Sequence, residues 1–215
     1  MKTIQMVAAM WVLTAATAAL AAESEGKVLF DGKDASGWQN DRGGAPSSSW
    51  VIEDGALTRK EKAGNVWTKE RYGDFLLELE YKTAGNSGIF IRTGSPRDCV
   101  QTGIEIAIDT PSREPGRHST GALYDLVAPT KVADRPAGEW NQVAIRAQGG
   151  KISVVLNGEP VVDADVDLWT EAGKNPDGSP NKFRAALKDF PREGHIGFQD
   201  HGAFVAFRNV RIRAL

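Results

Sequence analysis

Hydrophobic and polar residues alternate along most of the chain with a period of two, and the 3.6-residue period of an amphipathic helix is scarce. Gly, Pro, Asn and Asp separate the alternating runs, which is typical of short β-strands joined by turns. The strands expected from this pattern cover residues 27–30, 49–53, 56–59, 75–82, 88–93, 103–109, 121–124, 140–147, 152–156, 195–199 and 203–213. About eleven strands in one domain imply an all-β sandwich or closed barrel, and we expect a two-sheet sandwich.

The clearest local prediction is a hairpin over residues 151–162, whose two strands meet at Asn157 and Gly158. Both turn residues tolerate the positive φ that a two-residue hairpin turn requires. Two further segments, residues 39–49 and 168–193, are polar and interrupted by Gly, Ser and Pro, and they fit no strand. Loops of that length in a compact domain are usually functional rims or lids, or are mobile.

The N-terminal segment predicts export from the cytoplasm. Lys2 precedes an apolar run that ends near Leu20, and Ala19 and Ala21 form a small-x-small cleavage site. This pattern is that of a secretory signal peptide over residues 1–21, because its apolar run is shorter than the roughly 20 residues that span a bilayer. Residues 22–215 are then one soluble domain, which we expect in the periplasm or outside the cell.

Charge and cysteine content narrow the candidate functions. The net charge is only −2 at pH 7, which argues against a nucleic acid or an anionic membrane as partner. Cys99 is the only cysteine, so no disulfide can form within the chain. Neither a phosphate-binding glycine loop nor a set of metal-binding cysteines is present, which argues against nucleotide chemistry.

Three predicted strands share one design, with aliphatic residues on one face and polar residues around a Gly or Ala on the other. The residues expected on the polar face are Asn86, Gly88, Phe90 and Arg92 in the first strand, Glu105, Ala107 and Asp109 in the second, and His195, Gly197, Gln199 and His201 in the third. If the three strands are neighbours in one sheet, they form a concave polar groove with small residues at its base.

Each polar residue also has a structural interpretation. Arg92 and Glu105 could form a cross-strand ion pair on a solvated face. His195, beside a glycine at the start of a strand, is expected to make a structural hydrogen bond. His201 could cap the turn in which it lies, although a role in chemistry is favoured for it.

Residues outside these three strands are less distinctive. His118 lies in a polar loop where it could serve either a turn or a site. Lys69 follows Trp67 and could reach a ligand or lie along the Trp ring. Cys99 is expected to be a structural thiol, since no base accompanies it in the sequence.

Glu105 and Asp109 are poorly placed for ordinary glycoside hydrolysis. Four residues of strand separate their Cα atoms by about 13 Å. The two carboxyl groups of a glycosidase lie only about 5 to 9.5 Å apart. The pair therefore fits better in a wider set that includes Arg92, Gln199 and His201.

Nine segments, in this order, resemble the bacterial 3-keto-disaccharide hydrolase family and span nearly all of residues 22–215. They are residues 29–38, 50–57, 72–78, 86–92, 103–105, 120–124, 138–141, 156–158 and 194–202. The resemblance implies a concanavalin A-like lectin/glucanase fold, which is an antiparallel jelly-roll sandwich whose concave face binds sugar. It also implies hydrolysis of 3-keto glycosides, which are sugars already oxidised at C3 by another enzyme.

A ketone at C3 acidifies the C2 hydrogen, so a base can remove it, the C1 substituent can leave by elimination, and water can add back. This route needs a base, a group that stabilises the enolate, and an acid. We assign His201 or Glu105 as the base, and Arg92 or a bound divalent ion as the group that stabilises the enolate. His201 and two carboxylates could form a site for such an ion. The substrate-binding candidates are Lys69, Asn86, Asp109, Tyr124, Gln199 and Asp200.

Three other functions remain open at this stage. The same fold hosts noncatalytic carbohydrate-binding modules. It also hosts endo-glucanases, whose Glu-x-Asp-x-x-Glu strand motif fails here because Ala107 and Thr110 occupy the second and third acidic positions. A domain without any sugar role would show bulky side chains over Ala107 and Gly197.

Overall fold

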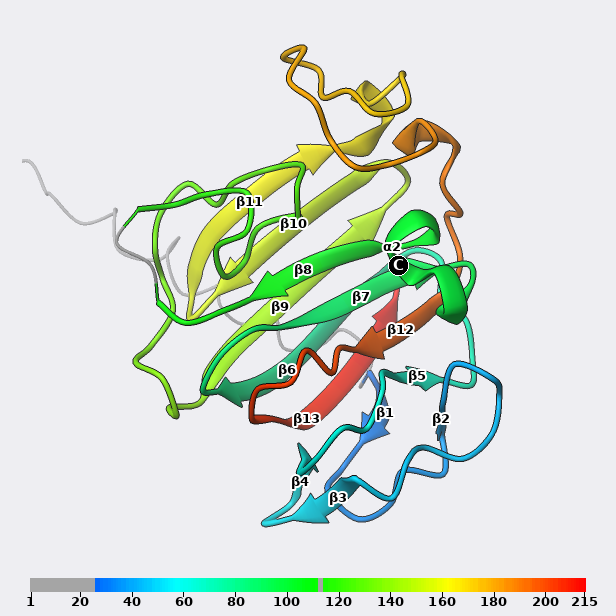
Figure 1. Ribbon diagram of the computed structural model, residues 1–215, viewed down its shortest axis with the longest axis vertical. Helices are drawn as coiled ribbons and strands as arrows, with labels where there is room; N and C mark the ends of the chain where they lie inside the picture. Colours follow the sequence, from blue (N-terminus) through cyan, green and yellow to red (C-terminus); the bar gives the residue numbers. More distant parts are fainter. Residues whose placement is uncertain (1–25, 112–113) are drawn as a thin grey trace, which may run out of the picture.

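The computed structural model describes residues 26–111 and 114–215, and the predicted signal peptide lies outside them. Two antiparallel sheets are packed face to face (Figure 1). Sheet A has the order β11-β10-β9-β6-β13-β4-β3, and β1 also pairs with β13. Its strands are β1 (Lys27–Phe30), β3 (Trp50–Glu53), β4 (Ala56–Arg59), β6 (Phe75–Thr83), β9 (Asn141–Gln148), β10 (Lys151–Leu156), β11 (Glu159–Asp165) and β13 (Val205–Ala214).

Sheet B has the order β2-β5-β12-β7-β8. Its strands are β2 (Trp38–Gln39), β5 (Val66–Thr68), β7 (Ser87–Thr93), β8 (Ile104–Ile108) and β12 (His195–Phe198). The helical turns are η2 (Pro96–Asp98), α2 (Cys99–Thr102), η3 (Val166–Leu168) and η4 (Leu187–Asp189). The predicted two-sheet, all-β sandwich is confirmed. Among the described residues, no helix is both long and apolar enough to span a membrane.

The two sheets enclose the hydrophobic core. The rings of Phe198 from sheet B and Phe207 from sheet A stack with their centroids 3.9 Å apart, and Trp38 stacks on Phe198 at 4.8 Å. Burial of each large apolar side chain contributes about 1.5 to 3 kcal/mol, so this aromatic stack joins the sheets strongly. The core-facing residues of the three strands singled out in the sequence are Ile89, Ile91, Ile104, Ile106, Ile108, Ile196 and Phe198.

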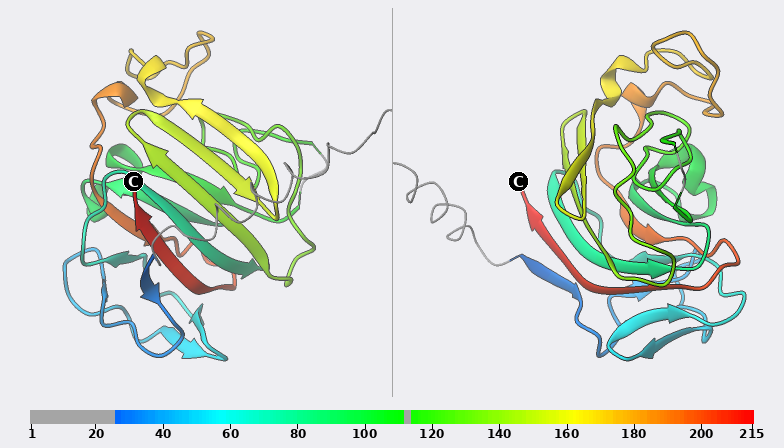
Figure 2. Two further views of the ribbon diagram at one scale, coloured as in Figure 1. Left: turned by 180° about the vertical axis from the view of Figure 1, so that it is seen from behind. Right: turned by 90° about the vertical axis from the view of Figure 1, so that its left-hand side faces the viewer.

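Positive backbone angles shape the larger sheet. The predicted hairpin is confirmed as β10 and β11, with φ of 53° at Asn157 and 84° at Gly158. In β13, Asn209 has φ of 53° where the register with β6 shifts between Arg208 and Arg211. The bulge bends the strand, and the right-hand view of Figure 2 shows sheet A curving around the other layer.

The strand predictions were wrong in two places. Residues 121–124 make only isolated bridges, from Leu123 to Ile106 and to Val127, because positive φ angles at Gly121 and Asp125 turn the chain. The sequence pattern also missed β2 and β5, which are 2 and 3 residues long and therefore too short to show a period of two.

Candidate functional site

The three strands with polar faces are neighbours in sheet B, as predicted. β12 pairs with β7, and β7 pairs with β8. Gly197 lies opposite Phe90, which lies opposite Glu105, and in the next row Gly88 lies opposite Ala107. Because successive side chains alternate across a sheet, these residues share the face turned away from the core, called here the outer face.

Glu105 is the most unusual residue of the outer face. Its side chain lies over Gly88, where an added Cβ atom would overlap the carboxyl oxygen Oε1. The residue is only 9% exposed, and no described residue donates a hydrogen bond to its carboxyl group. Burial raises the pKa of Glu105 to about 7, although the positive charge of Lys182 opposes the shift. A carboxyl group with such a pKa can exchange a proton near neutral pH.

A small pocket adjoins Glu105; its cavity volume is about 10 Å³, which is room for about one water molecule. The other residues that line it are Phe90, Val100, Gly103, Tyr124, Lys182 and Phe183. α2, which carries Val100, lies over β7 and β8 (Figure 1). The backbone N–H of Tyr124 donates to the Glu105 carbonyl oxygen over 2.9 Å, which fixes Tyr124 beside β8.

Aromatic and cationic groups are stacked at one end of this pocket. Lys182 Nζ lies 3.6 Å from the centroid of the Tyr124 ring, a cation–π contact. His118 stacks on the same ring with the centroids 4.5 Å apart, and its Nε2 lies 3.2 Å from Oδ1 of Asp125. The loop residue His118 therefore contacts a residue that lines the pocket with Glu105.

The segment that carries Lys182 is held in place from two sides. Asp125 Oδ2 accepts the Lys182 backbone N–H over 2.9 Å. Gln101 of α2 donates from Nε2 to the Lys182 carbonyl over 3.1 Å, and its Oε1 accepts the Arg184 N–H over 2.8 Å. The amide group of Gln101 thus binds the backbone on both sides of residue 183 and fixes the segment against the outer face.

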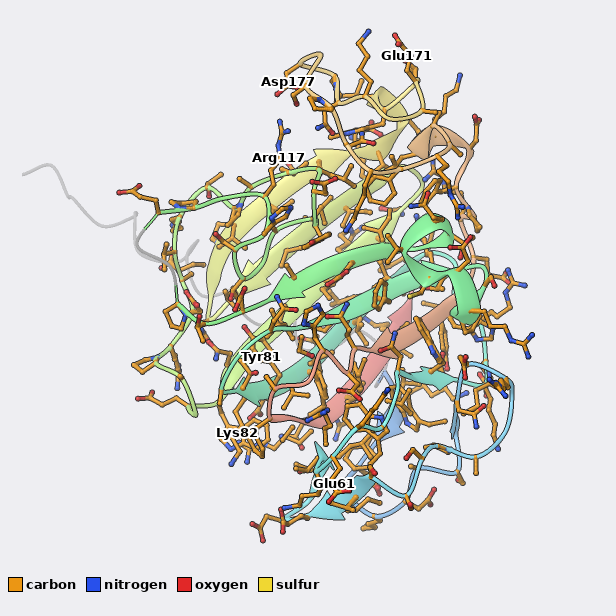
Figure 3. The ribbon with its side chains drawn as sticks, in the orientation of Figure 1. Glu61, Tyr81, Lys82, Arg117, Glu171 and Asp177 are labelled. Carbon is orange, nitrogen blue, oxygen red and sulfur yellow. The ribbon has the colours of Figure 1, made fainter. Side chains whose placement is uncertain are left out.

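A second contact fixes the tip of the same long loop. Arg117 forms an ion pair with Asp177 at 2.7 Å and donates to Ser179 Oγ over 2.8 Å. Figure 3 shows Arg117 extending toward the loop that carries Asp177. Residues 168–193, expected to be a rim or lid, therefore pack against the loop that carries His118 and Tyr124.

The polar surface continues along the strands from Glu105. Asn86 Nδ2 donates to Asp109 Oδ2 over 3.2 Å, so the structure brings these two predicted residues together. The Gln199 N–H donates to the Gly88 carbonyl over 2.9 Å, which places Gln199 on the opposite side of Gly88 from β8. The side-chain Oε1 of Gln199 is buried and accepts no hydrogen bond from a described residue. Glu105 and Gln199 therefore flank the same glycine.

The structure corrects the predicted position of Arg92. Arg92 has φ of 50°, and the register between β7 and β12 shifts between His195 and Gly197, so the alternation of side chains fails there. Its guanidinium donates to the carbonyls of Gly73 and Gly149 and forms an ion pair with Asp74 at 2.8 Å. Arg92 thus links the sheets at their edge, away from the outer-face pocket, and the alternative Arg92–Glu105 ion pair is not formed.

Two other predicted residues make structural contacts. Asp200 forms a close ion pair with Arg59 and accepts the backbone N–H groups of Ala63 at 2.7 Å and Gly64 at 2.9 Å. Burial raises the pKa of Asp200, but these hydrogen bonds prevail and lower it below the ordinary value. His195 Nδ1 lies 2.8 Å from the Thr68 carbonyl, so it makes the structural hydrogen bond expected for it.

His201 and Lys69 lie at exposed positions. His201 is in the turn between β12 and β13, and Lys69 directly follows β5. The described residues contain no group of three His, Cys, Asp or Glu side chains that could hold a metal ion. The possible ion site of His201 and two carboxylates is therefore not assembled among these residues.

The base of the expected groove also differs from the prediction. The indole ring of Trp67 lies against Gly197, so that a Cβ atom there would overlap it. Trp67 also contacts the Phe90 ring at 5.4 Å, and both residues are fully buried. A large side chain therefore covers Gly197, which is the feature expected above of a domain without a sugar role, and the expected groove is not open there. The pocket lies to one side, at Glu105.

Sequence reasoning missed Lys182 and Gln101. Both lie outside the alternating strands, Lys182 in a polar loop and Gln101 in a single helical turn. Neither belongs to a short motif that predicts chemistry. Only the tertiary contacts described above bring Lys182 to the pocket beside Glu105 and Gln101 to the backbone of Lys182.

Comparison with known proteins gives a family match over nearly all of the described chain. The family model described as a 3-keto-alpha-glucoside-1,2-lyase-like domain matches residues 25–213. A 3-keto-disaccharide hydrolase of Bacteroides thetaiotaomicron is 27% identical over 224 residues, covering 87% of this chain and 77% of that protein.

Solved structures show the same architecture. A crystal structure of a candidate glycosyl hydrolase from Parabacteroides distasonis superposes with a TM-score of 0.79 and 31% identity, covering 89% of this chain and all of that one. A β-glucanase of Bacillus licheniformis matches with a TM-score of 0.50 and 14% identity, covering 89% of this chain and 99% of that one. The second likeness concerns the fold alone, which is a jelly-roll sandwich of the lectin/glucanase type.

Proposed function

The chain belongs to the family of 3-keto-alpha-glucoside-1,2-lyase-like domains, and from this we propose that it hydrolyses 3-keto glycosides by elimination and rehydration. The 27% identical relative named 3-keto-disaccharide hydrolase supports a sugar as substrate. The single observation that carries the mechanism is the buried Glu105 carboxyl, which has no described hydrogen-bond partner and lies at a pocket on the outer face.

Glu105 is the proposed base. As a carboxylate it takes the acidic C2 hydrogen of the 3-keto sugar, and the electron pair of that C–H bond moves into the C3 carbonyl to give an enolate. The enolate then expels the C1 oxygen, which leaves as an alcohol after protonation. Addition of water across the resulting C1–C2 double bond completes a net hydrolysis. A pKa of about 7 makes Glu105 both an available base at neutral pH and a usable acid for the return proton.

Glu105 is favoured over His201 for this role by its surroundings. Glu105 lies in a pocket with a cation and an aromatic ring, whereas His201 is exposed in a turn. Asn86, Asp109 and Gln199 continue the polar surface and are proposed to bind sugar hydroxyls. His201 and Lys69, which are exposed after β12 and β5, are proposed to contact the substrate beyond the reacting carbons.

The proposed site needs no pair of glycosidase carboxylates. A single base suffices because the ketone, and not an oxocarbenium ion, carries the developing charge. The N-terminal sequence further supports export of the enzyme to the periplasm or beyond the cell, where such sugars would reach it.

The test is incubation of the purified protein with 3-keto-trehalose and a 3-keto-β-glucoside, each beside its unoxidised parent, with products followed by mass. We expect release of the C1 substituent from the oxidised sugars alone. Runs in D₂O should place deuterium at C2 of the product, and a parallel run with chelator reports on metal dependence.

Other outcomes distinguish the remaining candidate functions. Binding of the sugar without product would identify a carbohydrate-binding module. Cleavage of the unoxidised parents would identify an ordinary glycosidase. Either result would contradict the proposed function.

A further inference from the structure

We propose that Lys182 is a second catalytic residue, whose ammonium group donates a hydrogen bond to the C3 oxygen of the substrate as negative charge develops there. The inference rests on the proposed function and assigns the positive group that elimination requires. The sequence analysis assigned this role to Arg92 or a bound divalent ion, and the guanidinium of Arg92 is fully engaged elsewhere.

Position is the first argument for Lys182. It is the cationic side chain that lines the pocket together with Glu105. A base and a positively charged donor that face one pocket can act on adjacent atoms of a substrate, here the C2 hydrogen and the C3 oxygen. Stabilisation of the developing oxyanion by such a group is often the largest contribution to catalysis of this kind.

The second argument is that no described carboxylate occupies the N–H donors of the Lys182 ammonium group. No carboxylate of a described residue lies within ion-pair distance of Lys182 Nζ, and the Tyr124 ring at 3.6 Å is its close described neighbour. An aromatic face attracts a cation without accepting its three N–H donors as a carboxylate would. Lys182 is thus oriented while its donors stay available to a ligand.

The third argument is that both backbone polar groups of Lys182, its N–H and its carbonyl, form hydrogen bonds. Asp125 accepts its N–H, and Gln101 donates to its carbonyl. Lys174, another exposed lysine of the same loop, instead pairs its ammonium group with Glu171 at 3.1 Å. Lys174 therefore offers a matched control in the same segment.

In the proposed step, atoms and charges balance without a further reactant. The C2–H bond breaks and its proton moves to the Glu105 carboxylate. The electron pair forms the C2–C3 double bond, and the C3 oxygen gains the negative charge that faces Lys182. When the C1–O bond breaks, the C3 carbonyl forms again, and the C1 oxygen takes the proton from Glu105 and leaves as an alcohol. Glu105 is then a carboxylate again, and Lys182 returns to its starting state.

The test compares K182M, K182R and the control K174M with the wild type. Methionine keeps the length and the packing on Tyr124 but removes the charge. Two rates are measured: kcat for a 3-keto-β-glucoside, and exchange of the C2 hydrogen for deuterium in a 3-keto sugar without a leaving group at C1. The exchange isolates enolate formation, and thermal melts establish that each variant is folded.

We expect K182M to lower both kcat and the exchange rate by about 10²- to 10³-fold with a smaller change in KM. K182R should recover part of this loss, and K174M should match the wild type. An active wild type beside a K182M variant within threefold of it in both rates would overturn the role of Lys182 alone. A wild type that neither cleaves nor exchanges would overturn the proposed function and this inference together.

Discussion

Arg92 and Glu105 lie on neighbouring strands and are both buried, but they differ in the number of hydrogen-bond partners of their charged groups. Arg92 is 1% exposed, and its guanidinium has three described acceptors, two carbonyls and the Asp74 carboxylate. Glu105 is 9% exposed, and its carboxyl has no described donor. A buried charge that is fully hydrogen-bonded serves the fold, whereas one left without partners costs stability and marks a place where chemistry is expected.

The difference has a direct electrostatic consequence. Transfer of a charge from water into the protein is unfavourable unless partners replace the lost hydration. Three acceptors do so for Arg92. No partner replaces the lost hydration of the Glu105 carboxylate. Its pKa therefore rises to about 7, and the neutral form dominates below that pH.

Removal of Arg92 should produce the largest effect on stability. R92A leaves the Gly73 and Gly149 carbonyls without their donor and Asp74 without its partner, and we expect a loss of about 3 to 5 kcal/mol in the free energy of unfolding. Denaturant unfolding of R92A beside R92K measures it, with R92K expected to lose less because it keeps the charge. A loss below 1 kcal/mol in R92A would contradict the structural role.

Removal of the Glu105 charge should instead raise the free energy of unfolding at neutral pH. The unfolded chain ionises Glu105 near its ordinary pKa of 4.5, but the folded chain does so only near 7. Wild-type stability is therefore lost progressively as the pH rises through this window, by at most about 3 kcal/mol. E105Q lacks this loss, so the difference in unfolding free energy should grow in its favour from pH 4.5 to 7 and then stay level. A difference that is constant with pH would contradict the raised pKa.

The smallest of these effects should be that of the G88A substitution on kcat. A methyl group at this position would overlap the Glu105 carboxyl, so G88A should displace the base and lower kcat by roughly tenfold, about 1.4 kcal/mol in the barrier. G55A is a suitable control, because nothing lies within 4 Å of an added Cβ atom there and only backbone strain is introduced. Equal kcat values for G88A and the wild type would show that the position of the carboxyl is not critical.

The sequence predicted the parts of this site that depend on local alternation. The period of two correctly placed Glu105 on the face of its strand that is opposite to the isoleucines. The three strands proved to be adjacent. The same rule failed for Arg92, because its positive φ and the nearby register shift cannot be read from residue types. Gly197 was correctly placed on the outer face, but the ring that covers it comes from β5, a strand too short to predict.

Lys182 shows a second limit. Its loop has no hydrophobic period, and its position depends on contacts with Gln101 and Asp125, which are far from it along the chain. Such long-range polar contacts leave no local pattern. The resemblance of the motifs to a family indicated the substrate, but the packing of this loop was needed to identify the cation beside Glu105.

The most direct test of the account is the pH dependence of kcat/KM for a 3-keto-β-glucoside, measured for the wild type and E105Q. If Glu105 is the base, the wild-type kcat/KM should rise with pH, reach half of its maximum near pH 7 and then level off, since only the carboxylate can accept the C2 proton. E105Q should be about 10²- to 10⁴-fold slower and should lack that limb. An E105Q enzyme with wild-type rates and the same pH profile would contradict the account.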